Sequence, residues 1–370
     1  MKFVSLYEVA QISNGKDHKS LPDGKIPVYG SGGIMRNANQ YIYDKESVLI
    51  PRKGSIGNIF YVDTPFWTVD TIFYTKIDID KLIPKFLYYY LKTQHLEDLN
   101  IAGGVPSLTK TVLDKIQIPL PPLPIQQEIV KILDNFTEHT TILTAMITTE
   151  FTARKKQYKY YLNKLMTFDS DVPMLELCMI GTILRGNGLQ KSDFTENGVG
   201  CIHYGQIYTY YDTFTYETKS FVSPGLASKL KKIHKGDIII TVTSENVEDV
   251  CKCVAWLGED EIVTGGHTAI LKHNQNPKYI AYYLKTEAFF VQKCKIVHGT
   301  KVIEVTPKDL QRIQIPVPSL QEQARIVAIL DKFDAVINDM STALTSELSA
   351  RRKQYEYYRD KLLTFKEVSQ

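Results

Sequence analysis

Long hydrophobic runs are missing from this sequence, which has no uninterrupted apolar stretch near the length of a membrane span. A transmembrane helix needs roughly 20 apolar residues, so we expect none. The first residues, MKFVSLYEVAQISNG, scatter polar side chains and lack a small-residue cleavage site, which argues against a secretory signal. Cysteine is scarce and odd in number, at Cys178, Cys201, Cys251, Cys253 and Cys294. Reduced thiols of this kind suit a cytoplasmic protein.

A strong charge of either sign is also missing, because 44 basic and 41 acidic residues leave a formal net charge of +3. Nucleic-acid-binding domains are often more basic, so any DNA-binding surface must be a local patch. The hydrophobic content of 44% and the charged content of 23% are typical of globular proteins. A chain of 370 residues is too long for one ordinary core and predicts two or three domains.

Catalytic motifs are absent as well. There is no Gly-x4-Gly-Lys-Ser/Thr phosphate loop, and the histidines form no His-x-x-x-His pair. An amino-methyltransferase would need Asn/Asp-Pro-Pro-aromatic; the nearest stretch, NPKY at 276–279, lacks the second proline and reads as a helix start. The sequence therefore predicts a chain without catalytic residues, cofactor-binding residues or metal ligands.

The CKC stretch at 251–253 places two thiols on one face of an expected strand. Zinc would need two further ligands at usable spacing, and Cys201, Cys294 and His267 do not provide it. Buried structural thiols are the interpretation we prefer over a metal site.

What the sequence does contain is a long internal repeat. ARKKQYKYYLNKLMTF (153–168) returns 197 positions later as ARRKQYEYYRDKLLTF (350–365), and IQIPLPPL (116–123) returns as IQIPVPSL (313–320). Each copy predicts a short strand ending in proline, at 116–119 and 313–316. A run of about 40 residues follows with neither glycine nor an internal proline, which predicts a helix of roughly 60 Å.

Apolar residues in each predicted helix recur in alternating steps of three and four, with one extra step of four near Phe151 and Leu348. This spacing is typical of a coiled-coil seam with one stutter. The order of segments favours two antiparallel helices. The predicted seam comprises Ile129, Leu133, Phe136, Thr140, Leu143, Ile147, Phe151, Arg154, Tyr158, Tyr161 and Leu165 in the first copy, and Ile326, Leu330, Phe333, Ile337, Met340, Leu344, Leu348, Arg351, Tyr355, Tyr358 and Leu362 in the second.

The basic, tyrosine-rich end of each helix has two interpretations. Its tyrosines can fill the last turns of the seam while its cations complement the negative end of the helix dipole. Alternatively, the same residues can dock a partner or contact phosphate. The first reading is the simpler one.

The segments before the two helices are more distantly related. KFLYYYLKTQ (85–94) is similar to KYIAYYLKTE (278–287), and both predict short amphipathic helices with tyrosine stripes. SVLIPRKGSIGNIFYV (47–62) predicts strand, basic glycine turn and strand, and KGDIIITV (235–242) contains a matching apolar run. The predicted domains are 1–115, 116–168, 169–312 and 313–370: a globular module and a strand-plus-helix segment, each present twice.

The expected fold class is α+β, with two similar α/β modules separated by an antiparallel two-helix coiled coil and related by a pseudo-twofold axis. Duplex DNA has local twofold axes, and proteins of that symmetry read two half-sites at a fixed spacing. Diverged loops predict half-sites of different sequence.

Candidate DNA-reading residues lie in loops rich in amide, hydroxyl and basic side chains, because arginine or lysine suits guanine and asparagine or glutamine suits adenine. In the first module these are Lys16, His18, Lys19, Arg36, Asn37, Asn39, Gln40, Arg52, Lys53, Ser55 and Asn58. In the second they are Arg185, Asn187, Gln190, Lys191, His203, Tyr204, Gln206, Thr243, Ser244 and Asn246. Lys229, Lys231, Lys232 and Lys235 fit phosphate contacts. For any one of them a solvated loop side chain is the simpler reading.

The order of module, SLTKTVLDKIQIPLPPLPIQQEIV (107–130), long helix and then the same again resembles the specificity (S) subunit of type I restriction–modification systems, over the whole chain. The resemblance implies two target recognition domains that each read half of a split double-stranded DNA sequence, and paired helices that space them and dock two modification (methyltransferase) subunits. It also implies a separate restriction (endonuclease/translocase) subunit. This chain would be non-catalytic, while the methyltransferase would use S-adenosylmethionine and the nuclease ATP and Mg. One departure is length, since 370 residues is somewhat short for this family.

A different class of function stays open at this point: a non-enzymatic coiled-coil scaffold whose modules bind protein or glycan. The near-neutral charge favours that reading mildly, and the repeat favours the first one strongly. A self-sufficient methyltransferase or nuclease is disfavoured by the missing motifs.

Overall fold

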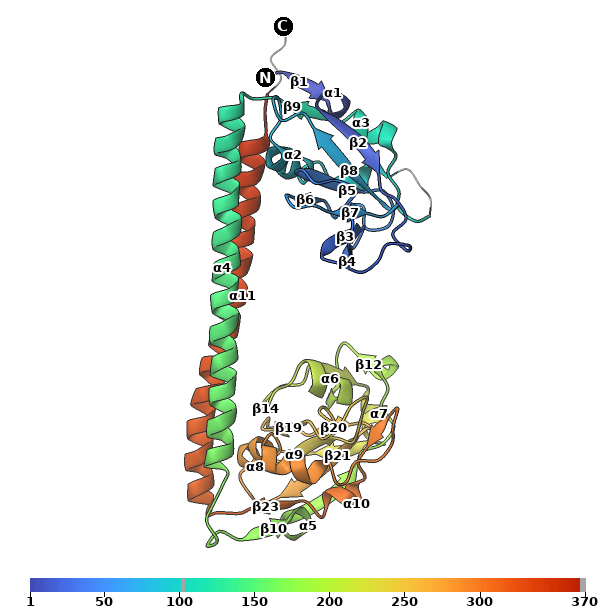
Figure 1. Cartoon of the computed structure of the whole chain (residues 1–370). Coiled ribbons are helices and arrows are strands. Elements are labelled where there is room, and N and C mark those ends of the chain that lie inside the picture. The colour runs from blue at the N-terminus through green and yellow to red at the C-terminus, as the bar shows by residue number, and fades with distance from the viewer. Residues whose placement is uncertain (101–103, 367–370) are drawn as a thin grey trace. The chain divides into compact units, whose positions relative to one another are not determined.

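The computed structural model describes residues 1–100 and 104–366 and divides into two compact units (Figure 1). Unit 1 combines Met1–Ile147 with Leu344–Gln370, and unit 2 comprises Thr148–Ala343. Two long helices, α4 (Leu123–Leu165) and α11 (Leu320–Leu363), each contribute one segment to both units. None of the helices in these described ranges is long and apolar enough to cross a membrane.

Unit 1 is built on a four-stranded sheet of order β2-β8-β5-β6 and a three-stranded sheet of order β4-β3-β7. Its other elements are short helices and the pair β1-β9. The bounds are β1 Phe3–Ser5, α1 Leu6–Val9, β2 Ala10–Asn14, β3 Ile26–Gly30, β4 Gly33–Ala38, β5 Ser47–Pro51, β6 Phe60–Val62, β7 Trp67–Thr68, β8 Ile72–Ile77, α2 Pro84–Leu91, η1 Leu96–Leu99, α3 Lys110–Asp114 and β9 Gln117–Pro119.

Unit 2 repeats this plan with larger sheets, of order β11-β21-β17-β19-β14 and β12-β15-β13-β20-β16, and with the pair β10-β23, which corresponds to β1-β9; it adds the pair β18-β22. The strands are β10 Met174–Glu176, β11 Gly181–Arg185, β12 Phe194–Thr195, β13 Val199–Ile202, β14 Phe214–Thr215, β15 Ser220–Val222, β16 Lys231–Ile233, β17 Ile238–Thr241, β18 Thr243–Ser244, β19 Cys253–Trp256, β20 Ile262–Thr264, β21 Thr268–His273, β22 Ile303–Glu304 and β23 Gln314–Pro316. The helices are α5 Leu177–Ile180, η2 Lys191–Asp193, α6 Tyr204–Thr209, α7 Pro224–Ala227, α8 Pro277–Tyr283, α9 Glu287–Lys293 and α10 Pro307–Leu310.

The strand before each long helix pairs with the strand that opens its own unit. β9 runs antiparallel to β1, with Ile118 opposite Val4, and β23 runs antiparallel to β10, with Ile315 opposite Leu175. The IQIP stretch of the repeat therefore brings the end of each module back beside its beginning, just before the long helix starts.

Each module is joined to its long helix by a buried glutamine, with two of its three hydrogen bonds equivalent in the two units. Gln126 is fully buried; its amide nitrogen donates to the carbonyls of Lys81 and Pro121, and its oxygen accepts from the Ile83 N–H at 2.9 Å. In unit 2 the fully buried Gln323 donates to Pro318 O and accepts from the Asn276 N–H at 3.0 Å.

A carboxylate eight residues after each glutamine forms the second link between module and helix, and it too is present in both units. Asp134 accepts from Lys85 Nζ at 2.7 Å and from the Tyr89 hydroxyl at 2.6 Å. Asp331 accepts equivalent bonds from Lys278 and Tyr282, both at 2.8 Å. The tyrosine stripes predicted on the two short helices thus face the long helices, with their hydroxyls anchored on helix carboxylates.

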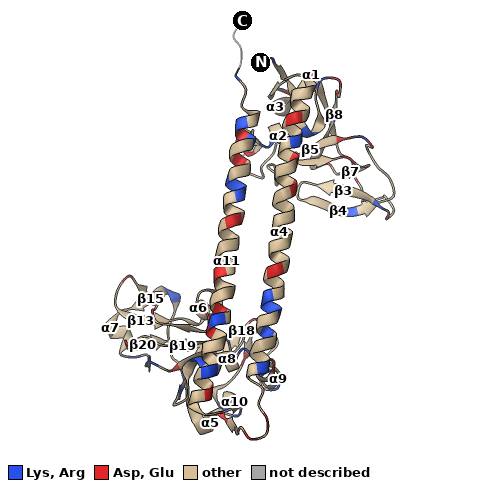
Figure 2. Cartoon of the chain, turned by 90° about the vertical axis from the view of Figure 1, so that its left-hand side faces the viewer, with Lys and Arg blue, Asp and Glu red and all other residues tan. Residues whose placement is uncertain are grey.

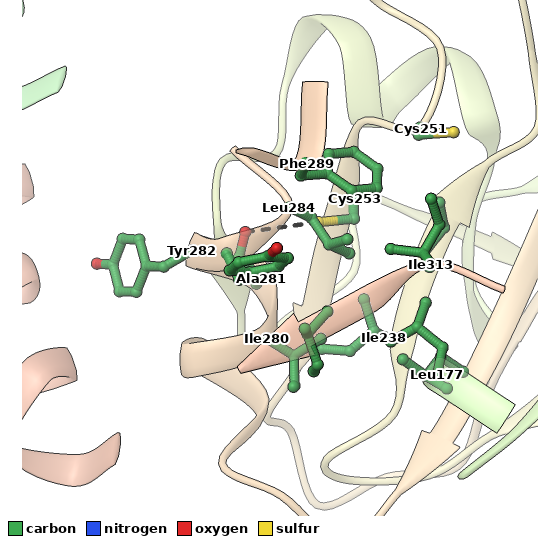
Figure 3. Close-up of a cluster of buried hydrophobic side chains, with 14 of the residues drawn as sticks. Leu177, Ile238, Cys251, Cys253, Ile280, Ala281, Tyr282, Leu284, Phe289 and Ile313 are labelled. Carbon is green, nitrogen blue, oxygen red and sulfur yellow. Dashed lines mark hydrogen bonds between the residues drawn. The ribbon is translucent and has the colours of Figure 1, made fainter. Parts of the chain in front are cut away.

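The core of unit 2 lies between the β11-β21-β17-β19-β14 sheet, α8 and α9 (Figure 3). Ile238 and Cys253 from this sheet meet Ile280 of α8, Leu284 just after α8 and Phe289 of α9, all buried. Unit 1 has the corresponding core, in which Val48 and Ile50 of β5 meet Phe86 and Leu87 of α2. At about 25 cal/mol per Å² of apolar area removed from water, burial of these side chains is the main source of each unit's stability.

The CKC stretch differs in part from its prediction. Cys253 opens β19, but Cys251 lies outside the strand with a left-handed φ of 65°. All five cysteines are free, and Cys251 and Cys253 are buried, where exclusion of water raises the pKa of each thiol to about 12. The Cys253 thiol points toward the carbonyl of Ala281. No group of His, Cys, Asp and Glu within residues 1–100 and 104–366 could hold a metal ion.

The two long helices pack antiparallel in each unit. In unit 1, Phe136 of α4 stacks on Tyr358 of α11 with ring centroids 5.3 Å apart, while Leu133, earlier in α4, shares a core with Leu363, later in α11. In unit 2, Tyr161 stacks on Phe333 at 5.3 Å. Residue numbers therefore rise along one helix as they fall along the other.

Most of the predicted seam is shielded from solvent. Ile129, Leu133, Ile326 and Leu330 are buried. Half-buried are Phe136, Thr140, Leu143, Ile147, Phe151, Tyr158, Tyr161, Leu165, Phe333, Ile337, Met340, Leu344, Leu348, Tyr355 and Leu362. Tyr358 is 38% exposed, yet its ring stacks on Phe136 across the seam.

Two seam positions were predicted wrongly, Arg154 and Arg351. Both arginines are exposed and donate to a glutamate one turn earlier, Glu150 and Glu347, each at 2.8 Å. The stutter rotates the stripe at this point, so the next heptad position faces water and carries an ion pair instead of a seam residue.

Candidate nucleic-acid interface

The sheet register of unit 1 collects three connections at one end of the four-stranded sheet. The last residue of β2, Asn14, lies opposite Phe73, and the last residue of β5, Pro51, lies opposite Ile72 at the start of β8. The segments that follow β2 and β5 and the segment that precedes β8 therefore leave the sheet together. We call the residues 15–19, 31–33, 52–58 and 69–71 the loop end of unit 1.

The turn between β3 and β4 belongs to this loop end because it touches the other segments. The Asn58 side-chain amide donates to Ser31 O at 3.4 Å, and the Trp67 indole N–H donates to Lys16 O at 3.0 Å. Lys19, Ser31 and Asp70 line one hollow in the surface. Three stretches predicted separately, around Lys16, Arg36 and Arg52, are thus neighbours in space.

Arg36 holds the loop end of unit 1 in place through hydrogen bonds to a neighbouring loop. Its guanidinium is half-buried and donates to Leu21 O at 3.0 Å and to Asp23 at 2.5 Å, so it ties β4 to the preceding loop. The loop end otherwise presents exposed Lys16, Lys19, Lys53, Ser55 and Asn58. Arg52 is half-buried, with its guanidinium 5.8 Å from the centroid of the Phe73 ring. His18 is half-buried, and Asn37, Asn39 and Gln40 are exposed along β4 and just after it.

Unit 2 forms an equivalent loop end by the same register. Arg185, the last residue of β11, lies opposite Ala269, and Thr241, the last residue of β17, lies opposite Thr268. The loop end of unit 2 therefore comprises residues 186–191, 203–206, 242–246 and 265–267. Its polar side chains fall into two groups, those that hold the loops and those that face outward.

Several predicted base readers of unit 2 hold the loops. The Asn187 amide donates to Lys229 O at 2.7 Å and accepts from Lys231 N at 2.9 Å. The Arg185 guanidinium donates to Glu304 at 2.8 Å and to Gly266 O. Because these polar atoms are already paired, the side chains fix loop geometry.

Three more predicted readers are engaged locally. Gln206 accepts from His203 N and donates to Ser220 Oγ, and Asn246 pairs with Asp249 through both its amide atoms. His203 is buried, its Nδ1 accepts from Gly205 N, and burial together with nearby Lys191 lowers the pKa of its imidazole. A buried neutral His203 shapes the start of α6 and does not reach outward.

The outward-facing group centres on a stack of rings. The Tyr204 ring lies 4.5 Å from that of His203 and 4.7 Å from that of His267. The exposed His267 shares a hydrogen bond of 2.9 Å between its Nδ1 and Thr243 Oγ1. Our sequence reasoning missed His267 as a site residue; the adjacent Gly265-Gly266 pair was the signal that marked a turn there.

Exposed cations lie on the loop end of unit 2 and on residues 229–231, which Asn187 ties to it. Gln190, Lys191, Lys229 and Lys231 are exposed, and in the described part of the chain these three lysines take part in no ion pair. Lys232 pairs with Glu261 at 2.7 Å and Lys235 pairs with Glu259. Ser244 is half-buried in β18.

The helix ends present a different surface. Figure 2 shows Lys and Arg on the last turns of α4 and α11. Tyr160 and Tyr357, at matching places in the repeat, are both exposed, and a lysine one turn later, Lys164 or Lys361, lies 5.8 Å from each ring centroid. Tyr158 instead turns inward; it is half-buried in the seam, and burial raises the pKa of its hydroxyl.

A duplicated α+β module, each copy with a polar, cationic loop end and its own long helix, defines a two-site recognition protein. The family model for the type I restriction modification DNA specificity domain matches residues 1–153 and again 174–350. The chain belongs to this family.

Relatives extend the match over nearly the whole chain. A putative type I restriction enzyme specificity subunit of Haemophilus influenzae is 31% identical over 97% of this chain and 94% of its own length. The EcoR124I/EcoR124II specificity subunit of Escherichia coli is 34% identical over 79% of this chain and 73% of its own.

Solved structures share the fold. A chain from a type I R-M system, solved in work on complex assembly and conformational transition, has a TM-score of 0.73 at 18% identity, covering 98% of this chain and 97% of that one. The HsdS subunit of Thermoanaerobacter tengcongensis has a TM-score of 0.54 at 17% identity, covering 98% and 96%.

Proposed function

We propose that this protein is the DNA sequence-specificity subunit of a type I restriction–modification complex and reads a bipartite DNA target, one half per unit. The observation that carries the proposal is the double match of one DNA specificity family to the two halves of the chain. Two loop ends support it, because the same strand register builds both while their side chains differ. Such a pair suits two DNA half-sites of different sequence.

In unit 1 the base contacts are assigned to the exposed side chains of the loop end, chiefly Lys53, Ser55 and Asn58. Lys16 and Lys19 flank them as phosphate contacts, and Arg36 positions the surface from inside. Amide and hydroxyl groups can pair with base edges in the major groove, whereas phosphate contacts position the protein without specifying sequence.

In unit 2 the base contacts are assigned to Tyr204, Ser244 and His267, and Thr243 orients the His267 ring through the bond to its Nδ1. Lys191, Lys229 and Lys231 are the phosphate contacts. Arg185, Asn187, His203, Gln206 and Asn246 act by holding the loops, because their polar atoms are already paired within the protein.

The basic helix ends are the proposed docking surface for modification subunits. Two equivalent exposed tyrosines with equivalent lysines suit two copies of one partner. In this proposal the chain is non-catalytic and binds no cofactor. The methyltransferase partner uses S-adenosylmethionine, a restriction subunit uses ATP and Mg, and the complex acts in the cytoplasm.

Co-expression tests the proposal. The chain is produced with the modification subunit encoded beside it, and genomic DNA is sequenced for methylated adenine. We expect a stable complex and methylation at a single split motif, with none when the modification subunit is expressed alone. Complex formation without sequence-specific methylation would contradict the proposal and favour a scaffold.

A further inference from the structure

Two large apolar side chains stand exposed at the loop end of unit 1. Ile34 and Met35, adjacent residues at the start of β4, are 61% and 60% exposed. They follow directly on the turn that carries Ser31, among the polar and basic residues already described. Neighbouring exposed apolar side chains often mark a binding site, because leaving apolar surface in water contributes nothing to the stability of the fold.

A β-bulge produces this arrangement. Val28 lies opposite Arg36, but the next residue, Tyr29, lies opposite Ile34, so Met35 is the extra residue on β4. Successive side chains of a regular strand alternate between faces, and the bulge breaks the alternation so that both neighbours face outward. Bulges of this kind re-aim a side chain at functional sites.

Glycines make room for the bulge. The Met35 sulfur lies so close to Gly30 that a β-carbon there would come within 2.5 Å of it, and Gly33 has a left-handed φ of 117°. Below the bulge, Arg36 ties β4 to the loop before β3 through Leu21 O and Asp23. The β4 strand that carries the Ile34–Met35 tip is therefore tied to the loop before β3.

The shape and charge of the surroundings indicate what covers the tip. The major groove of DNA admits a two-stranded ribbon. The pairing of β3 with β7 ends at Tyr29, and beyond it only β3 and β4 continue to the turn, so the tip of this three-stranded sheet is two-stranded. Exposed Lys19 and Lys53 lie on the neighbouring segments, where phosphates would flank an inserted ribbon. The apolar group that base edges offer in the major groove is the 5-methyl group of thymine.

We propose that Ile34 and Met35 contact thymine 5-methyl groups in the half-site read by unit 1. The inference rests on the proposed function and adds a direct preference for A·T pairs at the position of the tip. Unit 2 has no such ribbon tip among its described residues: there β13, which pairs in parallel with β20 as β3 does with β7, leads into α6 and Tyr204. The methyl preference belongs to one half of the motif.

Deoxyuridine substitution tests the inference, because it removes only the methyl group. The full chain is assembled with its methyltransferase partner and the methylated motif is determined. Each thymine, on either strand, is then replaced by deoxyuridine in oligonucleotides for binding measurements. We expect binding to weaken about fourfold for each methyl group contacted, and only in the half-site read by residues 1–115.

Matched variants locate the contact. The double variant Ile34→Ser/Met35→Ser should bind thymine and deoxyuridine duplexes equally. Ile79→Ser, which replaces a side chain 68% exposed elsewhere in unit 1, should keep the difference. Since all three side chains are exposed, circular dichroism should be unchanged.

Three outcomes would overturn the inference: a half-motif without A·T pairs, equal binding of thymine and deoxyuridine by the unsubstituted protein, or failure of the double variant to assemble with the methyltransferase. The last would assign the tip to a protein contact. Absence of any methylated motif would instead contradict the proposed function itself, so the two failures are distinguishable.

Discussion

At the scale of single residues, buried polar side chains join each module to its helix. Gln126 and Gln323 each bridge three groups at the point where the long helix meets the globular core. A buried donor or acceptor left without a partner costs about 1–3 kcal/mol, so these glutamines bear on stability more than their size suggests.

Gln126→Leu should lower the free energy of unfolding of unit 1 by about 2–4 kcal/mol, because it leaves the Ile83 N–H and the carbonyls of Lys81 and Pro121 unpaired. Urea unfolding followed by fluorescence measures this in a Trp256→Phe background, in which Trp67 is the only tryptophan. The neighbouring, exposed Gln127→Leu is the control and should change little. Equal effects of the two variants would show that Gln126 is not a structural link.

Asp334 gives the helix junction of unit 2 a dependence on pH. Burial raises the pKa of its carboxyl, although the Tyr282 hydroxyl donates to it at 2.8 Å and Lys285 lies nearby. An acid whose pKa is raised by folding holds its proton more tightly in the folded chain. It therefore stabilises the fold when protonated and loses that contribution as pH rises through the folded pKa.

Asp334→Asn should consequently make unit 2 more stable than the unsubstituted protein at pH 7, with a gain that shrinks as pH falls toward 4. Urea unfolding in a Trp67→Phe background, with Trp256 as the reporter, follows this across the range. A variant that is less stable at pH 7 would mean that the hydrogen bond from Tyr282 outweighs the cost of burying the charge.

At the scale of elements, the long helices follow from the sequence with little ambiguity. A run of 40 residues without glycine or internal proline and with a three–four apolar spacing leaves no other element to form, and the short tyrosine helices follow from the same periodicity. The stutter was visible, but its consequence at Arg154 and Arg351 was not. Whether an arginine at such a position faces the seam or the solvent depends on whether a glutamate one turn away can pair with it.

The candidate site was less predictable because it depends on contacts between distant segments. Loop composition identified Asn187 and Arg36, but not that their side chains bind backbone carbonyls 42 and 15 positions away. His267 joins the site because sheet register brings residues 265–267 beside 243–246. Which strands pair, when they lie far apart in the sequence, depends on tertiary packing, and the composition of the loops does not reveal it.

Lengthening α4 and α11 together by one heptad, inserted at matching depth in the seam, tests the helices as a spacer. Seven residues add about 10 Å, or roughly three base pairs of DNA, while keeping the seam in phase. We expect the gap between the two half-motifs to grow accordingly in methylation sequencing. An insertion of four residues in each helix, which rotates the stripe, is the control and should impair assembly; an unchanged gap after the heptad insertion would exclude the spacer role.

At the scale of the whole molecule, each module begins and ends in one pair of neighbouring strands. The pairings of β1 with β9 and of β10 with β23 bring the beginning and end of each module side by side, and within residues 1–100 and 104–366 the strands of each module pair only among themselves.

Replacing residues 1–115 with the equivalent module of a related specificity subunit should therefore change one half of the methylated motif and leave the other half and the gap unaltered. Methylation sequencing of cells expressing the hybrid with its modification subunit gives the answer. Replacing residues 174–312 is the reciprocal control. A hybrid that altered both halves would argue against independent reading.

The two junctions with the helices use the same chemistry twice, glutamine to backbone and lysine and tyrosine to aspartate, whereas the two loop ends share almost none of their side chains. The two copies thus keep the chemistry of the helix junctions, while they differ at the loop ends and in the size of their sheets. A descendant of this chain could acquire a new target through a handful of loop substitutions, and the attachment of its modules to the helices would be untouched.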